Sequence, residues 1–359
     1  MGKCVFSLLV LLCVMHVGCF SQGAIIPPQD NHISYEGRIG FKNGAAELSW
    51  PGTSITVQFV GTGISAQFKD ADTSNYYNII IDRDSIYKLT FDTTKKIYPL
   101  AAGLAYGKHT VEVFKRTEWD KGKTWFYGIV KDDKTKLLPP APKPKRKIEF
   151  YGNSISCGYG VEDPAGNNHA GYFENNYVAY PAITARHFNA QYQCIAKSGI
   201  GVMVSWFPLI MPEMYDRIDA TDSTGKWDFS KYTPDVVVIN LFQNDSWIVK
   251  QPTHAQFKAR FGTTAPTEDY IINAYKNFAQ TIRGKYPNAQ IICMLGNMDI
   301  TQQGSPWPGY VTKAVQQMND KKIFTYIAPY KNTPGHPVIA EQKALADGLI
   351  DFIDKHVRW

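Results

Sequence analysis

Lys147-Ile-Glu-Phe-Tyr-Gly-Asn-Ser-Ile-Ser-Cys-Gly-Tyr-Gly160 predicts a short strand that ends in a sharp turn. Residues 148–151 form the strand, and Gly152-Asn-Ser154 breaks it because glycine permits a tight backbone turn. A serine hydroxyl is a useful nucleophile only where it is exposed beside a base and faces amide donors. The start of the next helix points N–H groups at such a site. Ser154 is therefore a candidate nucleophile, although the motif alone also fits a β-turn with a capping serine.

Downstream of this stretch, strand-like runs alternate with helical runs. Residues 235–241 are almost continuously apolar, as expected of a parallel strand that is buried on both faces. The alternation predicts an α/β fold with a doubly wound parallel five-stranded sheet and right-handed crossovers, whose ligands bind at the carboxyl ends of the strands. Strands are expected at 148–151, 192–196, 236–241, 290–295 and 323–327, and helices at 177–188, 267–285, 310–318 and 337–355.

Upstream of this stretch, residues 32–138 contain only strand signals. Short runs rich in β-branched and aromatic residues are separated by turn residues, which is typical of a β-sandwich. We therefore predict a jelly-roll-like all-β domain at 24–138, a Pro/Lys linker at 139–147 that is extended and solvated, and the α/β domain at 148–359. The sandwich strands are expected at 46–50, 54–60, 64–69, 76–81, 85–91, 96–99, 109–116 and 124–130.

Residues 1–23 have the pattern of a secretory signal peptide, with a positive start, an apolar run and small residues near its end. The run is too short for a confident membrane span, so we expect a secreted, extracellular protein. Gly18-Cys19 would fit a lipoprotein processing site, but His16 stands where an aliphatic residue is expected. A lipid anchor or a periplasmic location is therefore less favoured.

Composition excludes several other classes of protein. The net charge is +6, and the basic residues are scattered without a long stripe, so we expect no nucleic-acid partner. Cys157, Cys194 and Cys293 remain after the signal, an odd number without metal-ligand spacing. We expect these cysteines to be buried thiols in a protein that needs no metal or other cofactor and is a monomer.

Three further blocks each follow a predicted strand. Ala196-Lys-Ser-Gly-Ile-Gly201 lets a backbone N–H approach a substrate oxygen, or is only a flexible turn. In Asn240-Leu-Phe-Gln-Asn-Asp-Ser-Trp247, Asn244 can offer a side-chain N–H to the same oxygen, or make an Asx-turn. Thr333-Pro-Gly-His-Pro-Val338 places His336 before the last helix, as a base or a capping residue.

These four blocks, in this order, resemble the SGNH (GDSL) hydrolase superfamily. More narrowly, the chain resembles carbohydrate esterase family 2, whose members join an N-terminal β-sandwich to an SGNH domain. The first block of that family reads Gly-Asp-Ser-Ile-Thr-Cys-Gly-Tyr-Gly, and here it reads Gly152-Asn-Ser-Ile-Ser-Cys-Gly-Tyr-Gly160. The resemblance covers most of the chain after the signal.

The resemblance implies a role for each matching residue. Ser154 would be the nucleophile and His336 the general base. The oxyanion donors would be the Ser154 amide, the Asn244 side chain and a glycine amide, with Gly199 the first choice and Gly201 the second. Two tryptophans near these blocks can stack on sugar rings or simply pack into the protein, namely Trp206 and Trp247.

The chain departs from the family pattern at three places. Asn153 replaces an Asp that is not part of the catalytic triad, and Phe242-Gln243 stands where the third block normally begins with Gly. Thr333 replaces the Asp three residues before the histidine, so no local carboxylate can orient the imidazole. We therefore expect a Ser–His dyad in which a backbone carbonyl orients His336, with Asp299 as the alternative acceptor.

The leading hypothesis is a secreted carboxylic ester hydrolase that deacetylates plant cell-wall polysaccharides such as xylan or mannan. Its partner would be the acetylated polysaccharide or oligosaccharide, cleaved through an acyl-enzyme on a serine. One alternative is a carbohydrate-binding protein with a degenerate esterase domain, which the missing carboxylate motivates. Another is an esterase of short-acyl lipids on the same fold.

Overall fold

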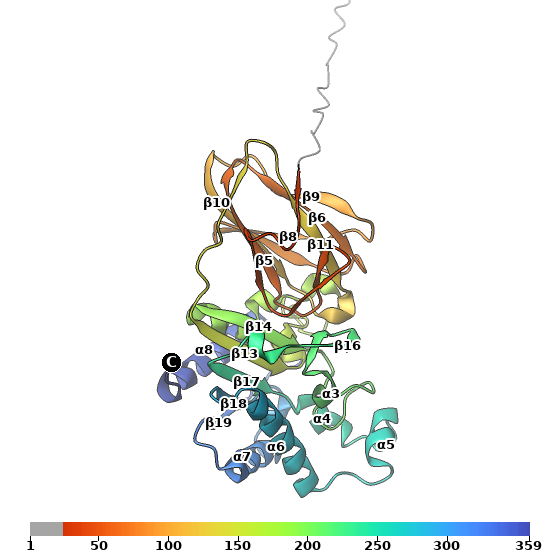
Figure 1. Cartoon of the computed structure of the whole chain (residues 1–359). Coiled ribbons are helices and arrows are strands. Elements are labelled where there is room, and N and C mark those ends of the chain that lie inside the picture. Colours follow the sequence, from red (N-terminus) through yellow and green to blue (C-terminus); the bar gives the residue numbers. More distant parts are fainter. Residues whose placement is uncertain (1–23) are drawn as a thin grey trace, which may run out of the picture.

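A β-sandwich and an α/β domain lie end to end in the computed structural model, which describes residues 24–359 (Figure 1). The signal peptide predicted at residues 1–23 lies outside the described residues. The two predicted domain types are confirmed: antiparallel sheets come first, and a parallel sheet with helices follows. None of the helices between residues 24 and 359 has both the length and the apolar composition needed to cross a membrane.

Two antiparallel sheets of six strands each form the sandwich. The first runs β3 (Ile39–Lys42), β4 (Ala45–Leu48), β11 (Thr124–Val130), β6 (Ile64–Asp70) and β9 (Lys96–Ala101), and β1 (Ile25–Ile26) pairs with β11. The second runs β12 (Lys136–Leu138), β5 (Ser54–Gly61), β10 (Gly107–Lys115), β7 (Tyr77–Ile81) and β8 (Ser85–Leu89), and β2 (Ile33–Glu36) pairs with β5. Buried and half-buried residues alternate along β6, because successive side chains of a strand point to opposite faces.

The α/β domain contains a parallel sheet of five strands. Their order is β14 (Ala190–Ala196), β13 (Arg146–Gly152), β17 (Val236–Asn240), β18 (Gln290–Leu295) and β19 (Ile323–Ile327). All five correspond to predicted strands. The four predicted helices are present as α2 (Tyr180–His187), α6 (Glu268–Lys285), α7 (Trp307–Met318) and α8 (Ile339–His356). Four short helices were not predicted, namely α1 (Ser154–Cys157), α3 (Met211–Met214), α4 (Gln243–Ile248) and α5 (Ala255–Phe261). The hairpin of β15 (Arg217–Asp219) and β16 (Asp222–Lys226) was not predicted either.

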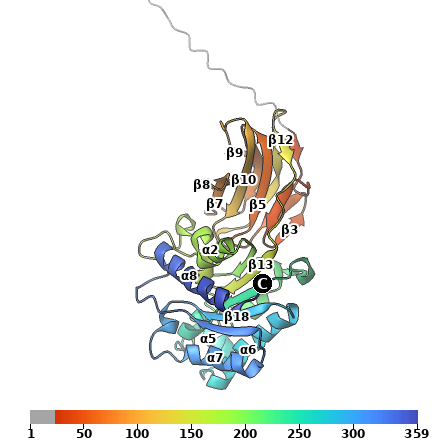
Figure 2. The same ribbon diagram turned by 90° about the vertical axis from the view of Figure 1, so that its left-hand side faces the viewer.

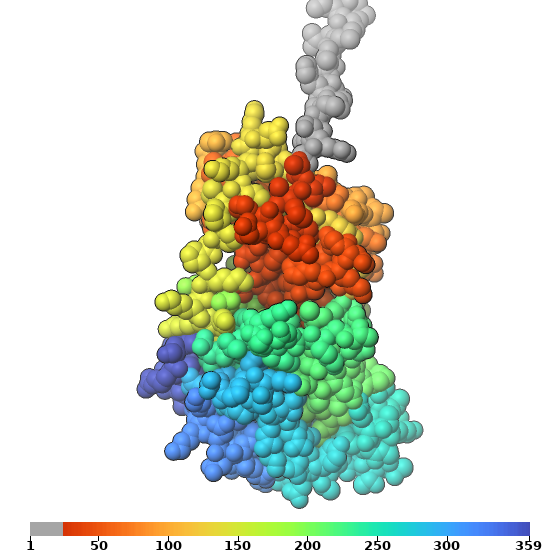
Figure 3. Space-filling view, in the orientation of Figure 1, coloured from red at the N-terminus to blue at the C-terminus, as the bar shows by residue number. Residues whose placement is uncertain are grey.

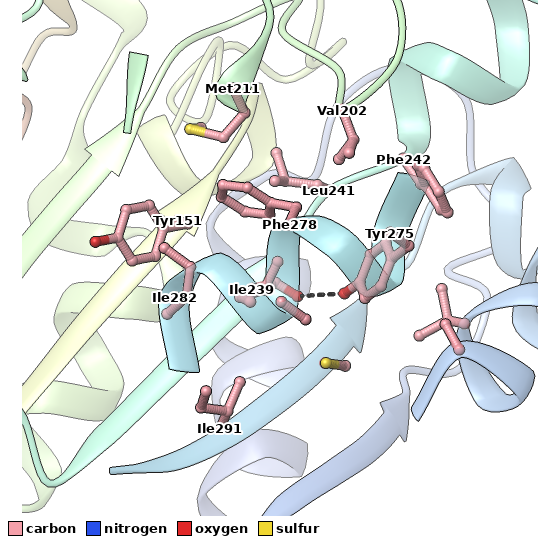
Figure 4. Close-up of a cluster of buried hydrophobic side chains, with 14 of the residues drawn as sticks. Tyr151, Val202, Met211, Ile239, Leu241, Phe242, Tyr275, Phe278, Ile282 and Ile291 are labelled. Carbon is pink, nitrogen blue, oxygen red and sulfur yellow. Dashed lines mark hydrogen bonds between the residues drawn. The ribbon is translucent and has the colours of Figure 1, made fainter. Parts of the chain in front are cut away.

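Helices cover both faces of this sheet, which explains the continuous apolar run of β17. On one face, Ile239 packs with Tyr275 and Phe278 of α6, and the Tyr275 hydroxyl donates a hydrogen bond to the Ile239 carbonyl at 3.2 Å (Figure 4). On the other face, Val238 packs against α2 and α8, which lie side by side (Figure 2). This packing on both faces fixes the positions of the five strands, and it therefore also fixes the start of each loop that follows a carboxyl end.

The sandwich packs directly against the α/β domain: in Figure 3, red atoms of the sandwich lie against green atoms of the α/β domain. A fully buried ion pair joins Arg38 of the sandwich to Glu149 of β13 at 3.0 Å. The connecting segment is anchored as well, since the Lys143 ammonium donates to the Tyr35 carbonyl at 2.7 Å. Strand β13 begins at Arg146, inside the segment predicted as a linker.

Candidate active site

Ser154 is the first residue of α1 and directly follows the turn that ends β13. Asn153 caps the helix by accepting the Ile155 backbone N–H at 3.1 Å. Only glycine fits at position 152, because a Cβ there would lie 2.0 Å from the Ser156 hydroxyl oxygen. The Ser154 backbone N–H has no hydrogen-bond partner among residues 24–359, so it is free to meet an oxygen of a substrate.

His336 reaches this serine from the loop between β19 and α8. Its Nε2 lies 2.9 Å from the Ser154 hydroxyl oxygen, across 182 residues of sequence. The His336 backbone N–H donates to the Gly166 carbonyl at 2.9 Å, and the ring lies against Tyr159 with ring centres 4.5 Å apart. Gly166 is required there, because its φ is +68° and a Cβ would lie 2.3 Å from the His336 carbonyl oxygen.

The imidazole is neutral at neutral pH. Burial lowers the pKa of His336 to about 4, against a smaller opposing effect of the Gly166 carbonyl. Within the described residues, no group makes a well-formed hydrogen bond with the buried Nδ1. The neutral ring can therefore accept the Ser154 proton through Nε2. The Gly166 carbonyl is the acceptor that lies close enough to the ring to raise the pKa of His336.

Asp299 does not orient His336, so that alternative from the sequence was wrong. Its carboxylate instead accepts hydrogen bonds from the Trp247 indole N–H at 2.8 Å and from the Gln243 side chain at 2.8 Å. These bonds hold Asp299 beside α4. Thr333, which replaces the usual Asp, donates its hydroxyl proton to Glu341.

The two candidate glycines of the second block have different surroundings. Gly199 has φ +80°, and its N–H has no partner within residues 24–359, so it remains a candidate oxyanion donor. Gly201 is removed from the candidates, because its N–H donates to the Ser205 hydroxyl at 2.9 Å. Gly201 serves a steric need, since a Cβ there would lie 2.0 Å from the Val204 carbonyl oxygen and 2.5 Å from a carboxylate oxygen of Asp245.

Asn244 is fixed in place at the start of α4. Its side-chain oxygen accepts the Trp206 indole N–H at 3.0 Å, and one of its N–H groups donates to the Ile200 carbonyl at 2.8 Å. A primary amide carries two such protons, so one remains for a substrate oxygen. The neighbouring Asp245 accepts the backbone N–H groups of residues 202–204, which directly follow the second block.

The two tryptophans differ in how far they face solvent. Trp206 is 42% exposed and stands beside Asn244, which suits a ring that stacks on a sugar. Trp247 is partly buried against the core, and Asp299 holds its indole. Sequence reasoning missed Tyr159, although it lies within the motif that contains Ser154, because nothing local shows that its ring meets His336.

A hydroxyl beside a neutral imidazole, together with N–H groups that are free to bind an oxyanion, is what acyl transfer requires. The hydroxyl oxygen can attack an ester carbonyl as the imidazole takes its proton. The backbone N–H groups of Ser154 and Gly199 have no hydrogen-bond partner among residues 24–359, and Asn244 keeps one N–H free, so these three groups are the candidate donors to an oxyanion. Among residues 24–359, the three cysteines are buried free thiols.

Comparisons with known proteins cover both domains. A model of the family described as carbohydrate esterase 2 N-terminal matches residues 35–142, and one of the GDSL-like lipase/acylhydrolase family matches residues 150–349. The cellulase/esterase CelE of Acetivibrio thermocellus is 34% identical over 93% of this chain, which spans only 40% of the length of that relative. An acetylxylan esterase / glucomannan deacetylase of Cellvibrio japonicus is 24% identical, with 93% of this chain and 91% of that protein covered.

Two solved structures are also similar to this chain over about nine tenths of its length. A family two carbohydrate esterase from Clostridium thermocellum, in complex with cellohexaose, is 34% identical with a TM-score of 0.79. The match covers 90% of this chain and 98% of that one. A carbohydrate esterase family 2 enzyme with a carbohydrate-binding domain from Corynascus is 27% identical with a TM-score of 0.78, covering 91% of this chain and all of that chain.

Proposed function

The chain belongs to carbohydrate esterase family 2, a family of carboxylic ester hydrolases with the GDSL-like domain, and from this membership we propose that it removes O-acetyl groups from plant cell-wall polysaccharides. The observation that carries the proposal is the 2.9 Å contact between His336 Nε2 and the Ser154 hydroxyl. Free N–H groups beside that contact support it. Export from the cell is part of the proposal, because the substrate is extracellular.

The reaction proceeds through an acetyl-enzyme. Ser154 Oγ attacks the acetyl carbonyl while His336 Nε2 takes the proton, and the oxyanion is met by the N–H groups of Ser154, Gly199 and Asn244. His336 then returns the proton to the departing sugar hydroxyl. A water molecule, deprotonated by the same nitrogen, releases acetate and restores Ser154.

We propose that the dyad works without a carboxylate behind the histidine. Losing the orienting Asp lowers kcat about 10⁴-fold in a serine protease, because the imidazole adopts the wrong tautomer. Here packing supplies part of that orientation, since the ring lies against Tyr159 and its backbone is tied to Gly166. The Gly166 carbonyl is the group we assign to hold the Nδ1 proton during turnover.

Acetylated xylan and mannan are the proposed substrates. The Cellvibrio japonicus relatives carry the name acetylxylan esterase / glucomannan deacetylase, and the Clostridium thermocellum structure contains cellohexaose. In this chain, the exposed Trp206 provides an aromatic face beside the candidate oxyanion donors.

The test is acetate release from 4-nitrophenyl acetate, acetylated xylan and acetylated glucomannan by the full chain. We expect the Ser154→Ala variant to lose activity by about 10³-fold or more, because the nucleophile is gone. Ser156→Ala is the matched control: this hydroxyl, in the same helix, contacts Tyr180 and not His336, so activity should remain. Acetate release by Ser154→Ala at the wild-type rate would rule out the mechanism.

Binding without cleavage is the second candidate, and the unpaired His336 Nδ1 favours it. A poorly oriented imidazole would leave a site that holds polysaccharide and turns it over slowly. Titration of the Ser154→Ala variant with cellohexaose measures binding apart from chemistry. Tight binding together with negligible wild-type turnover on all three esters would favour this function over deacetylation.

A further inference from the structure

We propose that Glu118, a residue of the β-sandwich, positions the oxyanion loop of the α/β domain and thereby makes the sandwich a working part of the esterase site. The oxyanion loop is defined here as residues 197–206, which contain Gly199. The proposal rests on the function given above, because Gly199 matters only if an oxyanion forms there. Glu118 acts through the loop, so it is a positioning residue.

Glu118 accepts two hydrogen bonds from Ser198, the residue that directly precedes Gly199, and we call this pair of bonds the clamp. Glu118 lies just after β10, and its side chain is completely buried. One carboxylate oxygen accepts the Ser198 backbone N–H at 2.7 Å, and the other accepts the Ser198 hydroxyl. Because the ψ angle of Ser198 sets the direction of the next N–H, these two bonds restrict where the Gly199 donor points. Bonds to an ionised carboxylate are also stronger than neutral ones.

Neighbouring groups of both domains reinforce these hydrogen bonds. The Lys197 ammonium lies between two aromatic faces, 4.1 Å from the Trp119 ring centre and 3.6 Å from that of Phe207. Trp119 belongs to the sandwich and Phe207 follows the loop, so the cation ties the two domains together. The backbone N–H of Glu118 donates to a carboxylate oxygen of Glu174 at 3.2 Å, which fixes the clamp itself.

A metal ion does not explain this cluster. Ligand oxygens of Glu118, Asp120 and Glu174 lie within 4.8 Å of one another, a spacing that could hold a cation. The Lys121 ammonium already lies 3.1 Å from Asp120 and 3.3 Å from Glu174. Both oxygens of Glu118 are used by Ser198. The Lys121 ammonium therefore takes the place beside Asp120 and Glu174 that a metal ion would need.

The loop is held independently at its other end. Asp245 of α4 accepts the backbone N–H groups of residues 202–204, from within the α/β domain. Losing Glu118 therefore leaves the loop folded but frees the Gly199 peptide to rotate. Outright removal of an oxyanion donor costs about 10²–10³-fold in kcat in a protease. A misdirected donor costs less, so we expect a loss of about 10-fold to 100-fold in kcat.

The experiment compares Glu118→Gln and Glu118→Ala in the full chain, with 4-nitrophenyl acetate as substrate. Gln keeps one acceptor oxygen and Ala keeps none, so we expect kcat to fall about 10-fold and about 100-fold respectively. KM should change less than about twofold, because this small ester makes little ground-state contact. Hydrogen exchange of residues 197–202 should quicken in Glu118→Ala, whether or not the ester is cleaved.

Glu149→Gln is the matched control. Glu149 is another fully buried glutamate at the domain interface, paired with Arg38, and it contacts no part of the oxyanion loop. We expect this variant to lower Tm while kcat stays at the wild-type value. An equal fall of kcat in Glu149→Gln and Glu118→Gln would overturn the proposal, because it would show general loosening of the interface.

The outcomes separate this proposal from the one on which it rests. A wild-type chain that cleaves no ester refutes the deacetylase function, and the exchange measurement still tests the clamp. A wild-type chain that is active, with Glu118→Ala at full kcat and unchanged exchange of the loop, refutes the clamp alone.

Discussion

Two glycines that stand two residues apart have opposite uses in this site. Gly199 adopts φ +80° with its N–H unpaired, so its backbone conformation and its free donor both matter. Gly201 gives its N–H to Ser205 and is small because Asp245 needs the space. The sequence pattern Gly-x-Gly could not separate them, because the difference depends on a hydroxyl and a carboxylate supplied by other segments.

Ser154 and His336 were easier to predict, because their positions follow from topology. Parallel strands end at one edge of the sheet, so the loops after the first and last strands meet there. The 2.9 Å contact between the two residues agrees with that expectation. The orientation of the ring was harder, since the Gly166 carbonyl comes from a loop without a sequence signal.

The pH dependence of turnover follows from His336 and Glu118, whose pKa values are shifted in opposite directions. Burial lowers the pKa of His336 to about 4, so its neutral, proton-accepting form is lost only as pH falls through about 4. Burial, with help from Asp120, raises the pKa of Glu118, so the clamp carboxylate is protonated at a higher pH. The charged groups around Glu118 are Lys115, Asp120, Lys121, Glu174 and Lys197.

We expect wild-type kcat to fall in two steps as pH is lowered from about 7, below the pKa of about 8 of Glu174, to about 3. In the first step it approaches the kcat of Glu118→Gln, because a protonated carboxyl and an amide each keep one acceptor oxygen. The variant should stay flat through that range and lose activity only where His336 is protonated. Acetate release at each pH measures this, and superimposable normalised profiles of the two proteins would contradict it.

At the scale of elements, the long periodic segments were predictable and the short ones were not. The five parallel strands and the four long helices stand where periodicity placed them, with shifts of a few residues at their ends. Strands β1, β2, β3 and β12 were missed, because two to four residues carry too little pattern. Helix α4 was not predicted, because its sequence holds polar residues that favour turns.

Phe242, directly before α4, combines two conflicting requirements. It has φ +78°, a left-handed conformation that costs a side-chain-bearing residue about 1–2 kcal/mol and that the family's usual glycine adopts freely. Its ring is fully buried between Tyr275 and Trp307, with ring centres 4.8 Å and 5.0 Å away. Packing therefore outweighs backbone strain, because truncating a buried Phe costs about 3–5 kcal/mol.

Replacing Phe242 should reverse the usual order of alanine and glycine. We expect Phe242→Gly to unfold with about 2 kcal/mol less free energy than wild type, the lost packing minus the relieved strain. Phe242→Ala should be less stable still, because it loses the same ring and keeps the left-handed strain. Urea denaturation of the three proteins measures this, and a Phe242→Ala variant more stable than Phe242→Gly would show that the turn is unstrained.

At the scale of the whole molecule, the sequence predicted two domains but not how they meet. Arg38 and Glu149 are separated by 111 positions, and no local pattern links them. The structure shows that the turn after β10 of the sandwich reaches the oxyanion loop. Such contacts form only when the two folded domains dock, and neither composition nor periodicity indicates how they dock.

Arg38 is the residue through which this docking can be tested. Its guanidinium is fully buried and binds Glu149 at 3.0 Å, the Tyr151 hydroxyl at 3.1 Å and the carbonyls of Tyr215 and Arg217 at 2.6 and 3.0 Å. Removing one partner of a buried pair leaves an uncompensated charge, at a cost of about 3–5 kcal/mol. Replacing both partners by apolar residues is much less costly, because no buried charge remains.

We therefore expect Arg38→Met to lower the free energy of unfolding by about 3–5 kcal/mol, and Arg38→Met/Glu149→Met to lose less than the single variant. Because the pair joins two domains, the single variant should also split one unfolding transition into two, as the sandwich releases the α/β domain. Urea denaturation, followed by far-ultraviolet circular dichroism and by tryptophan fluorescence, measures both effects. Coincident transitions and additive losses in the double variant would mean that packing around Trp50 and its bond to the Ile218 carbonyl, and not the ion pair, holds the domains together.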